Sequence, residues 1–249
     1  MAGPQGPVQC GTCGFLLNET VLVDAGTVGS RLHLEEQRRI RAALLTHLHF
    51  DHIRDLPTLA DNLIGDIEEP VMIAAIPDVL KGLESHIFNG EVYPDFFRIP
   101  DEQAPVLRAL PLQAGRESVV QGLKVIPIPV NHIVPTVGYI VIESGCAVLF
   151  SGDTGDTDQL WDVAARVPEL KAVFIESSFP NDMVELARVS KHLTPALLAM
   201  QLEKLGRPGI PVYVYHMKPK FESQIRTELG RLAIPGLSIL EEGQEMVLA

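Results

Sequence analysis

The segment from Thr46 to His52 carries four side chains that can bind a metal ion. It reads Thr-His-Leu-His-Phe-Asp-His and follows an apolar, strand-like segment. Residues two apart in an extended segment point the same way, so His47 and His49 can share one metal ion. The turn that follows aims Asp51 and His52 at a second ion. Burying so many polar groups without partners would be costly, so the motif predicts two adjacent metal sites.

Three more candidate ligands stand where apolar segments end: His132, Asp153 and His216. Asp153 is suited to bridge two ions, because a carboxylate has two oxygens and its charge offsets the repulsion between cations roughly 3.5–4 Å apart. The expected ligand sets are His47, His49 and His132 for one ion and Asp51, His52 and His216 for the other. Nitrogen and oxygen ligands without thiolate favour zinc, although iron or manganese would also fit. We therefore expect two divalent metal ions, with zinc as the first choice.

Two features precede the ligand segment. Asp24 ends an apolar segment and is a candidate carboxylate for orienting a ligand loop, with an Asx-turn as the alternative. Cys10 and Cys13 form a C-x-x-C pair, but no second pair completes a zinc cluster. A tight glycine-rich turn with reduced thiols is the favoured interpretation of this pair.

Short apolar, β-branched segments separated by Gly, Pro and Asp predict the strands that must position these ligands. The predicted strands span residues 20–26, 42–47, 70–76, 123–132, 136–144, 146–153, 171–178 and 211–217, with a last strand pair within 237–249. The predicted helices span 56–66, 77–88, 157–166, 181–189, 195–205 and 219–230. Thr194 is the expected N-cap of the fifth helix, with Pro195 at its first position. No repeat or linker interrupts this order, so residues 1–249 are predicted to form one α/β domain of layered sheets with helices outside.

The bulk composition limits the function. The 249 residues are 46% hydrophobic, which is enough for a large core, and no apolar run reaches the roughly 20 residues that span a bilayer. The N-terminus lacks the basic and apolar regions of a signal peptide, so we expect a cytoplasmic protein without a membrane partner. A net charge of −12 without dense Lys and Arg clusters disfavours a large nucleic acid. A small anionic substrate remains compatible, because bound dications reverse the local field.

The ordered ligand residues resemble the five motifs of the metallo-β-lactamase superfamily over nearly the whole chain. The matching positions, in order, are Asp24, the segment 47–52, His132, Asp153 and His216. The resemblance implies a four-layer αββα sandwich, with two mixed β-sheets, helices on the outer faces, and both metals at the edge where the sheets meet. Members share the fold and not the substrate, so the rest of the site must decide the function.

Three residues point to one branch of that superfamily. Asp153 stands where its β-lactamases commonly carry a cysteine, which favours phosphodiester, thioester or lactone hydrolysis. The segment 190–194 resembles the H-x-T element of the phosphodiesterase branch, which includes the tRNA-processing nucleases, and this makes His192 a general acid partnered by Glu176. A hydroxide held by the metals would be the nucleophile, and the leaving alkoxide still needs a proton. The expected catalytic residues are Asp51, Glu176 and His192, with an exposed or helix-capping His192 as the alternative.

Chain length separates two members of this branch. His132 and Asp153 are only 21 positions apart, which leaves no room for the arm that tRNA nucleases carry there to grip tRNA. The segments 21–36, 46–62, 85–100, 130–139 and 190–206 resemble the class II 3′,5′-cyclic-nucleotide phosphodiesterases and their bacterial relatives. Phe50 and Asp55 depart from that pattern, where Leu and Gly are usual, and Asp55 is expected to place a charge near the mouth of the site. We expect hydrolysis of cAMP or cGMP to the 5′-monophosphate.

Candidate substrate contacts come from an aromatic segment. Phe88, Asn89 and Tyr93 could hold a nucleobase, since stacking on one aromatic ring is worth roughly 1–3 kcal/mol. The alternative is packing in the core or at a homodimer contact. Other functions stay open at this stage: an RNA or small phosphodiester processor, a thioesterase, or a catalytically silent sensor that binds a nucleotide.

Overall fold

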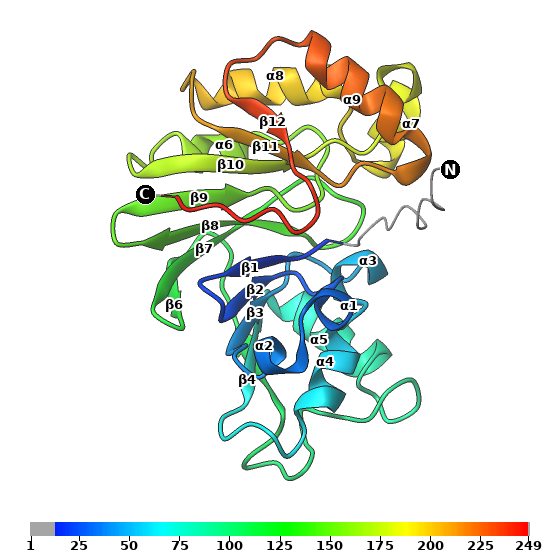
Figure 1. Cartoon of the computed structure of the whole chain (residues 1–249), viewed down its shortest axis with the longest axis vertical. Helices are drawn as coiled ribbons and strands as arrows, with labels where there is room; N and C mark the ends of the chain where they lie inside the picture. Colours follow the sequence, from blue (N-terminus) through cyan, green and yellow to red (C-terminus); the bar gives the residue numbers. More distant parts are fainter. Residues whose placement is uncertain (1–12, 249) are drawn as a thin grey trace, which may run out of the picture.

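The computed structural model describes residues 13–248, which form two β-sheets lying face to face with helices on both outer faces (Figure 1). The five-stranded sheet has the order β1-β2-β3-β4-β5, and the seven-stranded sheet has the order β12-β11-β10-β9-β8-β7-β6. Both sheets are mixed, because β1 is antiparallel to β2 and β6 to β9 form an antiparallel run beside parallel neighbours. The predicted fold class, a four-layer αββα sandwich, is confirmed.

The strands are short. Those of the first sheet are β1 Phe15–Leu17, β2 Val21–Val23, β3 Ala42–Leu44, β4 Val71–Ala75 and β5 Leu107–Pro111. Those of the second are β6 Ser118–Val120, β7 Leu123–Pro129, β8 Val137–Glu143, β9 Cys146–Phe150, β10 Leu170–Glu176, β11 Val212–Tyr215 and β12 Leu237–Ile239. Every internal strand expected from the sequence is present. The last strand pair was wrong, because the segment 237–248 forms β12 alone.

The helices divide between the two outer layers (Figure 1). Against the first sheet lie α1 Val28–Arg31, α2 Leu34–Gln37, α3 Phe50–Ile53, α4 Leu56–Leu63 and α5 Pro77–His86. Against the second lie α6 Gln159–Ala164, η1 Asn181–Met183, α7 Val184–Ser190, α8 Pro195–Leu205, η2 Pro219–Phe221 and α9 Glu222–Arg231. Thr194 caps α8 as expected, since its side chain accepts from the amide of Leu197. Within residues 13–248, no helix has the length and apolar character needed to cross a bilayer.

Three buried clusters separate the four layers. One lies between the first sheet and α4 and α5, another between the second sheet and α6, α8 and α9, and the third between the two sheets. The sheets are also joined by hydrogen bonds at one edge. The amide of Val137 donates to the carbonyl of Thr46 at 3.1 Å, and the Tyr139 hydroxyl donates to the carbonyl of Leu45 at 2.9 Å. These bonds fix the start of β8 beside the segment that leaves β3.

Parallel pairing explains why the candidate ligands meet at that edge. Strands β2, β3, β4 and β5 are parallel, as are β9, β10 and β11, so within each set the carboxyl ends share one edge. His47 follows β3, Asp153 follows β9 and His216 follows β11. The fold thus brings ligands that are far apart in the sequence to one place.

Gly138 on β8 is a packing requirement of this edge. A Cβ atom there would lie 2.7 Å from the carbonyl oxygen of Phe150 and 2.8 Å from that of Ser151, both of them backbone atoms with little freedom. Gly138→Ala should lower the free energy of unfolding by about 1–3 kcal/mol through overpacking, as measured by urea denaturation. Gly230 in α9 is the matched control, because a Cβ there meets nothing within 4 Å. Gly230→Ala should be neutral or stabilising by up to about 1 kcal/mol, and equal losses for both variants would contradict the packing explanation.

Candidate metal centre

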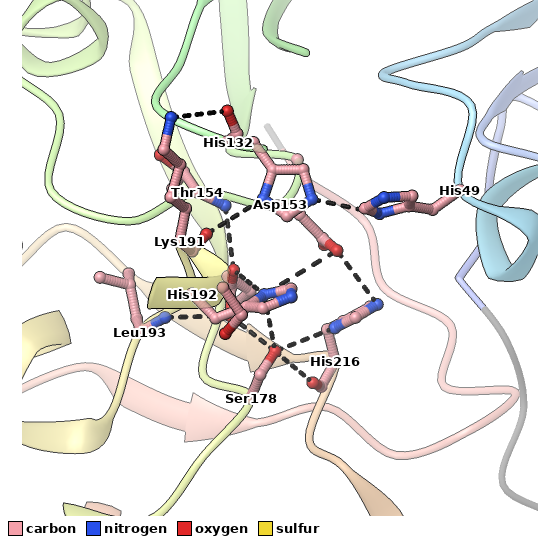
Figure 2. Close-up of polar contacts among 12 residues, drawn as sticks. His49, His132, Asp153, Thr154, Ser178, Lys191, His192, Leu193 and His216 are labelled. Carbon is pink, nitrogen blue, oxygen red and sulfur yellow. Dashed lines mark hydrogen bonds and ion pairs between the residues drawn. The ribbon is translucent and has the colours of Figure 1, made fainter. Parts of the chain in front are cut away.

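The predicted ligands converge in the folded chain. Ligand atoms of four residues lie within 4.8 Å of one another, and a second group with the same spacing adjoins it. The first group is His47, His49, His132 and Asp153, and the second is Asp51, His52 and His216. Figure 2 shows Asp153 between His49, His132, His192 and His216. Within the described residues this is the arrangement that the sequence predicted for two adjacent metal ions.

Asp153 is placed to contact both groups. Its carboxylate oxygens lie 3.8 Å from Nε2 of His47, 3.4 Å from Nε2 of His52 and 3.5 Å from Nε2 of His216. The side chain is almost fully buried, so its charge is not screened by water. This central position supports the expectation that Asp153 bridges two ions.

Two orphaned buried atoms show that metal ions fit this site. Nε2 of His47 and Oδ1 of Asp153 are buried and have no hydrogen-bond partner among the described residues. A buried polar atom without a partner costs about 1–3 kcal/mol, and a metal–ligand bond would remove that cost. The nitrogen and oxygen donors belong to the set that divalent zinc, iron and manganese accept. The His/Asp cluster is therefore consistent with a dinuclear metal centre.

The ligand histidines are oriented by partners on the far side of each ring. Metal-binding histidines commonly use one ring nitrogen for the metal and the other for such a partner. The pairs are His47 Nδ1 with Thr46 Oγ1 at 2.9 Å, His52 Nδ1 with Asp24 Oδ2 at 2.7 Å, His132 Nδ1 with the Lys191 carbonyl at 3.0 Å, and His216 Nδ1 with Ser178 Oγ at 3.1 Å. All four rings therefore present Nε2 to the cluster. His49 is turned the other way, with Nδ1 lying 3.1 Å from Nε2 of His132.

Asp24 lies where a carboxylate can orient the ligand loop. Besides His52, it accepts hydrogen bonds from the amide of Thr46 at 2.8 Å and from the Thr46 hydroxyl. These partners lie 22 and 28 positions along the chain, so the Asx-turn alternative does not describe its contacts.

The charged groups at the centre shift one another's pKa values. Burial opposes a proton on His52, but the carboxylates of Asp153 and Asp24 outweigh it and raise the pKa of this histidine well above its usual value. Burial likewise opposes ionisation of Asp153, yet the neighbouring His216 and His52 hold its pKa well below the usual range. The pKa of Asp51 is lowered by its hydrogen bond with His216. The cluster thus stabilises its carboxylates in the charged form, which is the form that binds cations.

Glu176 and His192 form a buried pair beside the ligands. Nδ1 of His192 donates to Oε1 of Glu176 at 2.6 Å and lies 3.9 Å from Asp153. Burial opposes the charge on His192, but the Glu176 carboxylate outweighs it and raises the histidine pKa. His192 is 6% exposed and Thr194 is the helix cap, so neither alternative for His192 holds.

The structure contradicts one of the three nucleobase contacts expected in the aromatic segment. The Phe88 ring is 1% exposed and belongs to the core cluster under the first sheet, so it cannot stack a ligand. The Asn89 side chain accepts from the amides of Glu91 and Val92, which closes a local turn. Tyr93 is half-buried and packs edge-on against Phe88. The packing alternative describes Phe88 and Tyr93, whereas the exposed Asn89 shapes a turn of its own segment.

Two departures from the family pattern are also resolved. Asp55 does not put a free charge at the mouth, because it is 8% exposed and accepts from the amide and hydroxyl of Ser30 and from Arg54. These hydrogen bonds from Ser30 connect α1 to the start of α4. Phe50, in contrast, is 61% exposed on α3 directly after the ligand His49.

The cysteine pair can be followed only in part, since Cys10 lies outside the described residues. Cys13 is a buried free thiol whose sulfur lies within 4.8 Å of ligand atoms of Asp24 and His52. Burial raises its pKa to about 12, so the thiol stays protonated.

The sequence reasoning missed several residues that support the centre. Thr46 and Ser178 orient ligand histidines, and Lys191 does so through its backbone carbonyl while its ammonium donates to the carbonyl of His132 at 3.0 Å. Lys218 adds a positive charge 3.8 Å from Asp51. Thr46 and Lys191 stood next to predicted site residues in the sequence, whereas Ser178 and Lys218 are positioned by tertiary contacts.

A two-sheet sandwich with a His/Asp cluster at the sheet edge defines the protein as a metal-dependent hydrolase of the metallo-β-lactamase fold. Residues 19–217 match the family model of the beta-lactamase superfamily domain, and the chain belongs to this family.

Similar proteins divide between two activities. Ribonuclease Z of Mycobacterium bovis is 28% identical over 181 residues, covering 68% of this chain and 62% of the relative's own length. A 3′,5′-cyclic-nucleotide phosphodiesterase of Schizosaccharomyces pombe is 29% identical over 100 residues, covering 40% of this chain and 27% of that protein. The crystal structure of unliganded yeast PDE1 superposes with a TM-score of 0.72 at 24% identity, covering 84% of this chain and 69% of that one. That structural likeness supports the fold.

The metal content follows directly from this geometry. Protein purified and reloaded with zinc should bind two ions per chain, because two ligand groups adjoin each other around Asp153. Elemental analysis after removal of loosely bound metal measures this ratio. A fully loaded protein that holds one tightly bound ion would contradict the dinuclear centre.

Proposed function

We propose that the protein is a metal-dependent phosphodiesterase whose substrate is a small anion, a 3′,5′-cyclic nucleotide such as cAMP or cGMP. The observation that carries this proposal is the buried Glu176–His192 pair, 3.9 Å from the central Asp153. Hydrolysis of a phosphodiester expels an alkoxide, which leaves readily only when a proton is delivered to it. A histidine held by a carboxylate beside the metal cluster is suited to that task.

Each group of side chains has a separate role in the proposed hydrolysis. Two zinc ions, held by His47, His49, His132, Asp51, His52, His216 and Asp153, would activate a water molecule and neutralise charge on the phosphate. Glu176 accepts a hydrogen bond from Nδ1–H of His192, so the proton that His192 can transfer is the one on Nε2. As the bond from phosphorus to the 3′ oxygen breaks and water oxygen bonds to phosphorus, His192 would protonate the departing oxygen to give the 5′-monophosphate. The Lys218 ammonium near Asp51 adds a positive charge for a phosphate oxygen.

The connection between β8 and β9 favours a small substrate. Glu143 and Cys146 pair directly across this hairpin, so a two-residue turn joins the strands. The interval between His132 and Asp153 therefore carries no protruding arm, and a net charge of −12 gives the surface little attraction for a polynucleotide. Both features support a mononucleotide over tRNA.

A tRNA-processing nuclease is the second candidate. It is favoured by the Mycobacterium bovis relative, whose name is Ribonuclease Z and whose match covers more of this chain than the phosphodiesterase match does. A small phosphodiester or thioester hydrolase and a nucleotide sensor without turnover are further alternatives on the same scaffold.

One assay separates these candidates. Zinc-loaded protein would be incubated with cAMP, cGMP, a 2′,3′-cyclic nucleotide, a chromogenic phosphodiester, an acyl-thioester and a precursor tRNA, with chromatographic identification of the products. We expect 5′-AMP or 5′-GMP from the cyclic nucleotides and no trimming of the precursor tRNA. Cleavage of the tRNA precursor without turnover of cyclic nucleotides would overturn the proposal, and binding of a cyclic nucleotide without product would identify a sensor.

A further inference from the structure

Ser178, two positions after Glu176, stands between the metal ligands and the proton donor. Its hydroxyl lies 2.7 Å from Oε2 of Glu176, 3.1 Å from Nδ1 of His216 and 3.2 Å from Nδ1 of His192. Figure 2 shows the contacts with His192 and His216 meeting at the Ser178 oxygen. The side chain is fully buried, so water does not compete for them.

The hydrogen-bonding capacities fix the direction of this network. A serine hydroxyl has one proton to donate and two lone pairs, whereas a carboxylate only accepts. The Ser178 hydroxyl therefore donates its hydrogen bond to the nearby Glu176 carboxylate, in preference to the carbonyl of His216 at 3.1 Å. Nδ1 of His192 already donates to Oε1 of Glu176 at 2.6 Å.

The direction of these hydrogen bonds determines the tautomer of His216. Because the Ser178 hydroxyl donates its hydrogen bond to Glu176, its oxygen can only accept a hydrogen bond from Nδ1 of His216. That bond keeps a proton on Nδ1, so Nε2, which lies 3.2 Å from Asp51 and 3.5 Å from Asp153, is the ring nitrogen left to bind a metal ion. A ligand histidine needs this tautomer to bind a metal.

Backbone contacts hold Ser178 in this position. Its amide donates to the carbonyl of Leu193, and its carbonyl accepts from the amide of Lys218 at 3.2 Å. His216 itself has a φ of 62°, a left-handed conformation that is uncommon outside glycine and needs support from its surroundings. Ser178 thus joins the segment that bears His192 to the segment that bears His216.

We propose that Ser178 is a positioning residue that couples the Glu176–His192 pair to the metal site formed by Asp51, His52 and His216. Glu176 makes the Ser178 hydroxyl a hydrogen-bond donor toward it, and the Ser178 oxygen in turn accepts from Nδ1 of His216 and so selects the tautomer of that ring. The part of this inference that concerns metal binding rests on the metal centre alone. The part that concerns rate rests on the proposed phosphodiester hydrolysis.

The first test removes the hydroxyl. Ser178→Ala should weaken binding of the zinc ion at the group formed by Asp51, His52 and His216 by about 10–100-fold, the usual cost of losing a partner that orients a ligand, while the other ion stays bound. Competition with a chromogenic chelator measures both affinities without any substrate. Ser177→Ala is the matched control, because the neighbouring Ser177 hydroxyl is equally buried and has no hydrogen-bond partner within the described part of the chain. Equal zinc affinities in the two variants would overturn the proposal.

The second test asks whether the effect passes through the serine. Glu176→Gln replaces a carboxylate, which only accepts, by an amide that can also donate. The Ser178 hydroxyl could then act as donor or as acceptor toward residue 176. This change should weaken the same zinc ion in the chain with Ser178, but cause no further loss in the Ser178→Ala background. Losses that simply add would overturn the coupling. If zinc binding follows this pattern and no phosphodiester is cleaved, the coupling stands and the proposed function fails.

Discussion

His192→Ala should lower kcat for a cyclic nucleotide by about 10²–10⁴-fold, the range that general acid catalysis contributes. The residue touches Glu176 and lies beside Asp153, but it belongs to neither of the two expected ligand sets. Both zinc ions should therefore remain bound, and the loss should appear in kcat. His86→Ala, which changes an exposed histidine at the end of α5, is the control and should behave as the unmodified protein does.

The leaving group makes this prediction specific. A p-nitrophenolate departs without a proton, whereas the 3′ alkoxide of a nucleotide needs one, so the loss in His192→Ala should be much smaller on a p-nitrophenyl phosphodiester. Steady-state rates on both substrates measure the contrast. Equal losses would indicate that His192 positions the phosphate, and an unchanged rate on both would show that it has no catalytic role.

Asp153→Ala should abolish turnover by disassembling the metal centre. It removes a ligand that contacts histidines of both groups and the buried charge that offsets repulsion between two cations. Loss of a residue that merely orients a ligand costs about 10–100-fold in metal affinity, and loss of a bridging ligand should cost more. Zinc stoichiometry and rate should fall together, and zinc should no longer raise Tm as it does in the unmodified protein.

Two variants sharpen this prediction. Asp153→Asn keeps the shape of the side chain but removes its charge, so it separates the electrostatic contribution from the loss of volume. Asp156→Ala removes a nearby exposed carboxylate that pairs with Lys204, and it should leave both zinc ions and the rate intact. If Asp153→Ala retained two zinc ions and normal turnover, its bridging role would be wrong.

The sequence by itself determined the local part of the site and most of the fold. The side chains of the segment 47–52 lie close because the chain between them is short, so their grouping follows from local geometry. The internal strands were found because their apolar, β-branched runs are bounded by turn residues. The strands that were missed, β1, β5 and β6, are half-exposed and lack such a continuous run.

The tertiary structure decided which distant residues meet and which polar groups are already paired. His132, Asp153 and His216 come together because β7, β9 and β11 run in the same direction and end at one edge, whereas the sequence showed only that each residue follows an apolar segment. Asp55 and Phe88 look like site residues in the sequence, yet one is bound to Ser30 and the other lies in the core. Ser178 looks like an ordinary serine, yet it contacts both His192 and His216. Hydrogen bonds and burial depend on neighbours far along the chain, so the pattern of residue types alone does not contain them.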